Sequence, residues 1–126
     1  MKRLWAAVIL LLVILGACIG SAVVVDKFAE TTVSHLEQSV SAAEKKDFKQ
    51  AAKFCTAASE HWHSKAGLLG ALLRHSEADD VEKGLAQLIA YAQTEDHDEF
   101  LALCAEVIHD VRHVRDMELP LLRNIL

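Results

Sequence analysis

The chain has 126 residues, enough for one domain, and its 13 Lys and Arg residues against 18 Asp and Glu residues give a net charge of −5. Two of the basic residues precede an apolar stretch near the N-terminus. The part of the chain after this stretch holds 11 basic and 18 acidic residues, a net charge of −7. Such an acidic domain lacks the basic patch of a nucleic-acid-binding protein, and it is not suited to lie flat on anionic lipid. We therefore expect no nucleic acid among its partners.

The apolar stretch Leu4–Val25 contains no charged residue. A helix of this length, at 1.5 Å of rise per residue, crosses the roughly 30 Å hydrocarbon core of a bilayer. Lys2 and Arg3 precede it, and the positive-inside rule then places the N-terminus in the cytoplasm. We expect residues 1–25 to form a cytoplasmic tip and a transmembrane anchor in a bacterial plasma membrane, and residues 26–126 to form an extracytoplasmic helical domain.

Two processing events compete with this uncleaved signal-anchor. A cleaved signal peptide would also begin with basic residues and end at small residues such as those of Gly20–Ala22. A lipoprotein signal would place a lipid on Cys18, because Leu15-Gly16-Ala17-Cys18 is similar to the bacterial lipobox. The apolar residues continue through Ile19–Val25, which favours the uncleaved anchor.

Amphipathic helices are predicted after the apolar stretch, because apolar residues recur at intervals of three and four. The first stripe, Val33–Ala43, follows the apolar stretch without a helix breaker, so one helix is expected to run from the span into the domain. A second helix is expected to begin at Asp47, which forms a capping box with Gln50. Its stripe, Phe48–Trp62, has small residues in the middle, which let a neighbouring helix approach closely.

Two further helices are predicted in the second half of the chain. Residues 66–93 contain no proline and are expected to form one long helix; the alternative is a break near Ser76, where Ser76-Glu77-Ala78-Asp79 is a weak start signal. The last helix carries the apolar stripe Phe100–Val114, and Pro120 is expected to end it. An apolar tail, Leu121–Leu126, follows.

The predicted fold is all-α, because no stretch alternates apolar and polar residues between turn signals as a strand would. Short connections between four amphipathic helices favour an antiparallel arrangement, and a seam period of about 3.5 residues favours coiled-coil-like packing. We therefore expect an N-terminal transmembrane helix that continues into an antiparallel bundle of about four amphipathic helices.

Several short motifs, each weak alone, are found together along nearly the whole chain. After a basic start and a single span they are Lys46-Asp47-Phe48-Lys49-Gln50-Ala51, Trp62, His75-Ser76-Glu77, Leu85-Ala86-Gln87-Leu88 with Tyr91, Val111–Val114 and Asn124-Ile125-Leu126. In these motifs taken together, the chain resembles domain of unknown function family 4363, which consists of short bacterial single-span membrane proteins. The Ala- and His-rich middle and Leu119-Pro120 depart from the pattern of that family. The resemblance implies the same topology and helical fold, and it implies no catalytic residues.

Histidine is the one unusual residue type, with seven copies. His109 and His113 are four residues apart, which places two imidazoles on one face of a helix, as a metal site requires. His75 lies on the apolar side of its helix, where a structural hydrogen bond is the ordinary role of a histidine and where protonation would make the fold pH-sensitive. We predict no metal and no cofactor, and keep these three residues as low-priority ligand candidates.

Two cysteines, Cys55 and Cys104, lie on apolar stripes. We expect them to be small buried residues. In an oxidising exterior they would be able to form a disulfide if their helices face each other.

The sequence carries no signature of a catalytic triad, a Cys-His pair or a glycine-rich phosphate loop, and we predict no enzymatic activity. We expect a membrane-anchored interaction or accessory module that binds an unknown protein partner or itself. Its interaction candidates are Trp62 and the apolar tail Leu121–Leu126, if these are exposed, and the Gly16-x-x-x-Gly20 pair, whose spacing allows two membrane helices to pack closely. The alternative is a histidine-based metal- or haem-binding bundle, and a hydrolase acting on envelope material would need an acidic side chain in a pocket.

Overall fold

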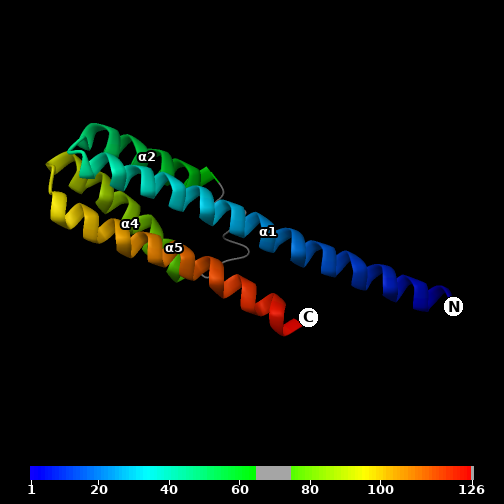
Figure 1. Cartoon of the computed structure of the whole chain (residues 1–126). Helices are drawn as coiled ribbons and strands as arrows, with labels where there is room; N and C mark the ends of the chain where they lie inside the picture. The colour runs from blue at the N-terminus through cyan, green and yellow to red at the C-terminus, as the bar shows by residue number, and fades with distance from the viewer. Residues whose placement is uncertain (65–74, 126) are drawn as a thin grey trace.

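The computed structural model describes residues 1–64 and 75–125, with the side chains of these residues except 75–77 and 117–125. The described chain forms four helices, α1 (Lys2–Glu44), α2 (Phe48–Ser64), α4 (His75–Thr94) and α5 (His97–Ile125), and contains no strand (Figure 1). This confirms the all-α prediction. Residues 65–74, with the first part of the long helix predicted over 66–93, lie outside the described residues.

Helix α1 runs without a break from an exposed apolar half into a half that packs in the bundle. It has 43 residues, about 65 Å of helix. Its apolar N-terminal half projects from the bundle, and large side chains between Leu4 and Val24 are exposed. Its C-terminal half is packed in the bundle, with Phe28, Leu36 and Ala43 at most 3% exposed. The predicted continuation of the first helix into the domain is therefore confirmed.

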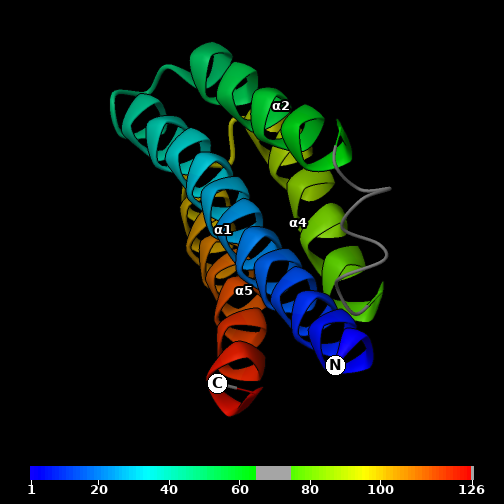
Figure 2. The ribbon, with the colours of Figure 1, turned by 90° about the vertical axis from the view of Figure 1, so that its right-hand side faces the viewer.

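The four helices form an antiparallel square. Helix α1 packs against α2 and α5, and α4 packs against the same two helices, so α2 and α5 lie on opposite corners (Figure 2). The predicted stripes face inward: Ala51, Cys55 and Ala58 of α2 are fully buried. Among the side chains of α5 that the structure describes, the buried ones are Phe100, Cys104, Val107, Val111 and Val114.

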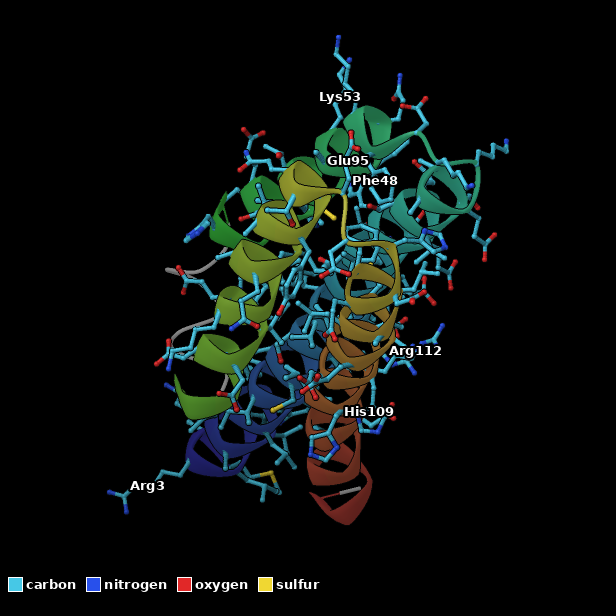
Figure 3. The ribbon with its side chains drawn as sticks, turned by 90° about the vertical axis from the view of Figure 1, so that its left-hand side faces the viewer. Arg3, Phe48, Lys53, Glu95, His109 and Arg112 are labelled. Atoms are coloured by element: carbon cyan, nitrogen blue, oxygen red, sulfur yellow. The ribbon has the colours of Figure 1, made fainter. Side chains whose placement is uncertain are left out.

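The two tight turns of the bundle have the same geometry. Lys46 after α1 and Glu95 after α4 both adopt a φ of 59°, in the left-handed region. The next amide, that of Asp47 or Asp96, donates to a carbonyl five residues back, at 2.9 and 3.2 Å. This is the Schellman motif, in which glycine is the usual left-handed residue. Both turns lie at the end of the bundle that is far from Arg3 (Figure 3).

The capping box predicted at the start of α2 is half correct. The amide of Gln50 donates to Asp47 Oδ1 at 3.2 Å, as expected. The amide of Asp47 donates to the carbonyl of Ala42 at 2.9 Å, so it does not need the Gln50 side chain as an acceptor. The backbone hydrogen bond of the Schellman turn thus replaces the one expected between the Asp47 amide and the Gln50 side chain.

The prediction that Pro120 ends the last helix is wrong, because α5 continues to Ile125. Within a helix a proline removes one amide donor and crowds the carbonyl four residues earlier, that of Asp116. The neighbouring residues are good helix formers, Leu119, Leu121 and Leu122. A local defect at one hydrogen bond is therefore accommodated within a continuous helix.

Gly84 brings α4 and α5 together, a contact that the sequence analysis missed. Gly84 is buried, and a Cβ added to it would lie 2.6 Å from Cγ2 of Val107. No side chain fits between the two helices at this level. A glycine inside an otherwise regular amphipathic helix is a signal for such a close approach.

Candidate functional site

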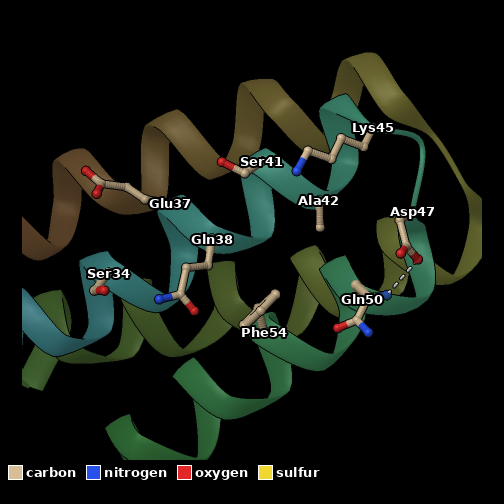
Figure 4. Close-up of a pocket in the computed structure, with 9 residues that line it drawn as sticks. All are labelled: Ser34, Glu37, Gln38, Ser41, Ala42, Lys45, Asp47, Gln50 and Phe54. Carbon is tan, nitrogen blue, oxygen red and sulfur yellow. Dashed lines mark hydrogen bonds between the residues drawn. The ribbon is translucent and has the colours of Figure 1, made fainter.

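An open groove with a volume of about 570 Å³ lies between the C-terminal half of α1 and the start of α2. Helix α1 supplies Glu37 and Gln38, Lys45 follows as its C-cap residue, and α2 supplies Gln50 and Phe54 (Figure 4). The groove follows from the local sequence, because polar residues of α1 alternate with the buried stripe that packs on α2. Figure 4 shows Phe54 directed from α2 into the space beneath α1.

The groove presents charges of both signs around one aromatic ring. The Glu37 carboxylate accepts a hydrogen bond from Arg112 Nη2 at 3.4 Å, which ties the rim of the groove to α5. Asp47 uses one carboxylate oxygen to cap α2. Lys45 and the amides of Gln38 and Gln50 add donors and acceptors on the two walls. Such a lining can bind a polar segment of another protein by hydrogen bonds around an apolar contact.

Aromatic rings close the other end of the α1–α2 interface. Phe28 of α1 stacks on His61 with 4.8 Å between ring centroids, and it lies 5.0 Å from the ring of Trp62. Trp62 is 4% exposed, so the structure places this interaction candidate in the core rather than on the surface. His35 lies 6.3 Å from His61, and its Nδ1 atom is buried without a hydrogen-bond partner among the described residues.

The pair His109 and His113 does share one face of α5, as its spacing predicts. The two rings are 6.3 Å apart with 5° between their planes, and both residues are exposed. Nδ1 of His109 lies 3.7 Å from Asp110, and His113 lines a cavity of about 180 Å³ with Asp80 and Asp110. Among the described residues, no group of three or more His, Cys, Asp or Glu side chains is arranged to hold a metal ion. The His75 side chain lies outside the described residues.

The glycine pair of the apolar half of α1 is unobstructed. A Cβ added to Gly16 or Gly20 would meet no other atom within 4 Å. A second membrane helix has room to approach there. Cys18, the lipidation candidate between these two glycines, is a half-buried free thiol.

A chain of hydrogen bonds crosses the bundle core at Cys55 and Cys104, both fully buried free thiols. The Ser39 hydroxyl donates to the Ala51 carbonyl at 2.7 Å. Ser39 Oγ also lies 3.0 Å from Cys55 Sγ, and because its single proton is already donated, the Cys55 thiol is the donor there. The Cys104 thiol in turn bonds to Cys55.

The hydrogen bond between the two thiols shifts their pKa values in opposite directions. The hydrogen bond to Cys55, together with burial, raises the pKa of Cys104 far above its ordinary value, because ionisation would remove the donated proton. The same bond lowers the pKa of Cys55, which accepts it. The chain joins α1, α2 and α5. The sequence placed the two cysteines on apolar stripes, but nothing in it pointed to Ser39 as their partner.

Residues 20–125 match the model of a family described as a domain of unknown function, DUF4363. The chain belongs to this family. The matched region begins inside the apolar stretch and includes the whole bundle, whereas Gly16 and Cys18 precede it. Neither the search of curated proteins nor the search of solved structures found a match. Membership confirms the resemblance seen in the sequence and assigns no activity.

Proposed function

We propose that this DUF4363 protein is a membrane-anchored helical module that binds a protein partner, or a second copy of itself, close to the membrane surface. The observation that carries the proposal is the division of α1. Only 6% of its most apolar 18-residue window is buried, while the rest of the same helix forms one side of the bundle. A contiguous apolar surface of this size is unstable in water and stable in lipid. Helix α1 is a candidate membrane span on these grounds.

The continuity of α1 supports a positioning role. Because no loop interrupts the helix between the apolar half and the bundle, the bundle is held at a fixed height above the membrane. The groove begins near Ser34, eight residues beyond Asp26, so it starts about 12 Å above the end of the apolar stretch. With Lys2 and Arg3 on the cytoplasmic side, the groove faces the exterior of the cell.

Photo-crosslinking in intact cells tests the partner. A photoreactive amino acid is placed at Gln38 or Gln50 in the groove, and the matched control is Gln93, an exposed glutamine of α4. We expect one discrete adduct from the two groove positions and none from the control. Adducts of equal yield from all three positions would contradict a specific groove.

The size of the adduct distinguishes the two kinds of partner. A dimer of this chain would identify self-association, for which the open Gly16 and Gly20 face offers a second contact. A heavier adduct would identify another protein. Resistance of the uncleaved full chain to extraction from membranes at alkaline pH tests the anchor separately.

A further inference from the structure

Cys55 and Cys104 connect two helical hairpins that are separate in the chain. Cys55 lies in α2, in the α1–α2 hairpin, and Cys104 lies in α5, in the α4–α5 hairpin. Helices α2 and α5 occupy opposite corners of the square (Figure 2), yet the two thiols are in hydrogen-bond contact in its core. The two cysteines therefore face each other, which is the condition for a disulfide between them.

Small side chains bring α2 close to the centre of the bundle at this level. Ala51 and Ala58, about one turn on either side of Cys55, are both fully buried. Because the inward residues of α2 are small here, a thiol of α2 reaches across the diagonal to α5. The two sulfurs need to move only from hydrogen-bond contact to the length of a covalent S–S bond, about 2.05 Å.

Oxidation of the two thiols leaves no buried donor without a partner. An S–S bond removes the hydrogens of both thiols, so neither sulfur has a proton left to donate. The Ser39 hydroxyl keeps its hydrogen bond to the Ala51 carbonyl, because Cys55 donates to Ser39 and takes no proton from it. The buried polar groups at this level are therefore satisfied with the S–S bond as well as without it.

We propose that Cys55 and Cys104 form a disulfide bond that joins the α1–α2 hairpin to the α4–α5 hairpin. The oxidising surroundings that this bond requires rest on the proposed position of the bundle outside the cell. The bond closes a loop of about 50 residues, which restricts the unfolded chain and thereby favours the folded bundle.

The oxidant is itself a disulfide, and two exchange steps form the bond. The Cys55 thiol loses its proton and attacks one sulfur of the oxidant, whose S–S bond breaks and releases a thiol that takes up the proton. Cys104 then attacks Cys55 Sγ, and the second oxidant sulfur leaves as a thiol with the proton of Cys104. The cysteine pair loses two electrons, and the oxidant gains them. Because both thiols are fully buried, the exchange takes place during folding or when the bundle opens.

Peptide mapping of the purified chain tests the pairing. The full chain with Cys18→Ala is equilibrated in detergent micelles with oxidised and reduced glutathione, quenched with acid, unfolded, alkylated and digested without reduction. We expect mass spectrometry to find the Cys55 and Cys104 peptides linked, with loss of nearly all the free thiol at both positions. Cysteines that stay free, or that carry only glutathione, would overturn the disulfide.

A cysteine moved to the outer face of α5 supplies the control. The double substitution Cys104→Ala and Ala102→Cys places the second thiol on the same helix at an exposed position. No peptide linked to Cys55 is expected from this variant. A linked peptide in equal yield would show that the contact in the core does not direct the pairing, which would also overturn the proposal.

Protein taken directly from cells tests the surroundings. Cells are quenched with acid, and the chain is unfolded, alkylated and mapped in the same way. Linked peptides would support the disulfide and the exterior position together. Free thiols in the cell, with linked peptides in glutathione, would contradict the exterior position and a disulfide there. Failure in glutathione would overturn the disulfide alone and leave the proposed function intact.

The linked and the reduced chain should also differ in stability. We expect the urea midpoint of the linked chain in micelles to lie at least about 1 M above that of the reduced chain, because the bond shortens the unfolded chain. An equal or lower midpoint would contradict a disulfide that holds the two hairpins together.

Discussion

The α1–α2 hairpin and the α4–α5 hairpin end in turns of the same geometry, with Lys46 and Glu95 both at a φ of 59°. Their helices are nevertheless joined by different contacts. A buried hydroxyl, Ser39, links α1 to α2 through hydrogen bonds, whereas α4 and α5 meet where Gly84 lies against Val107. The comparison shows that a turn sets the direction of a returning helix, while the residues along the seam decide how close it comes.

Thiol labelling tests whether the core is closed where Cys55 of the first hairpin meets Cys104 of the second, and it carries the largest expected effect. In a Cys18→Ala background, Cys55 and Cys104 should react with a maleimide at least about 100-fold more slowly than a cysteine placed at the exposed Ala102. Both thiols are fully buried, and the raised pKa of Cys104 keeps it protonated, so reaction requires opening of the bundle. Rates within tenfold of the control, followed by mass spectrometry, would contradict a closed core.

Substitution of Gly84 tests the seam of the second hairpin. Gly84→Ala should lower the free energy of unfolding by about 2 kcal/mol, because the new Cβ overlaps Val107, whose branched side chain has one strongly preferred rotamer in a helix. The measurement is urea denaturation of the full chain in detergent micelles, followed by circular dichroism.

A second substitution distinguishes overlap from other causes. In a Val107→Ala background the clash is absent, so Gly84→Ala should cause no further loss and should add the higher helix propensity of alanine. If the losses in free energy of unfolding from Gly84→Ala and Val107→Ala add up in the double variant, the close approach of Gly84 to Val107 is not the cause of the Gly84→Ala effect.

Ser39→Ala should lower the stability of the bundle by about 1 kcal/mol in the same assay, because it removes the donor to Ala51 and the acceptor for the Cys55 thiol. The control is Ser41→Ala, an exposed serine of the same helix, for which we expect a change within about 0.5 kcal/mol. Equal effects from the two serines would mean that the buried hydrogen-bond chain does not stabilise the α1–α2 seam.

The two turns should respond alike, and they give the smallest effect. Lys46→Gly and Glu95→Gly should each raise the free energy of unfolding by about 0.5 kcal/mol, since glycine adopts a positive φ without the steric cost of a side chain. Lys45→Gly should instead lower it, because Lys45 has a φ of −83°. A higher free energy of unfolding for only one of the two glycine variants would contradict the prediction that the two turns respond alike.

The sequence by itself determined the features that depend on local composition and period. The uncharged length of Leu4–Val25, the stripes at intervals of three and four and the Asp47 cap all follow from neighbouring residues, so the all-α fold and the candidate span were predictable. The family resemblance agreed with them. These signals are local because helical hydrogen bonds join residues four apart.

Only the tertiary structure decided which faces meet and which side chains remain available for function. It brought Ser39, Cys55 and Cys104 together from three helices, placed Trp62 in the core, and left His109 and His113 without a third ligand among the described residues. It also formed the α1–α2 groove, in which Asp47 and Gln50 of the helix-capping motif lie opposite Glu37 and Gln38, residues that no motif marks. Such contacts join positions far apart in the chain, and their geometry depends on the rotation and separation of packed helices, which the spacing of residues along one helix does not specify.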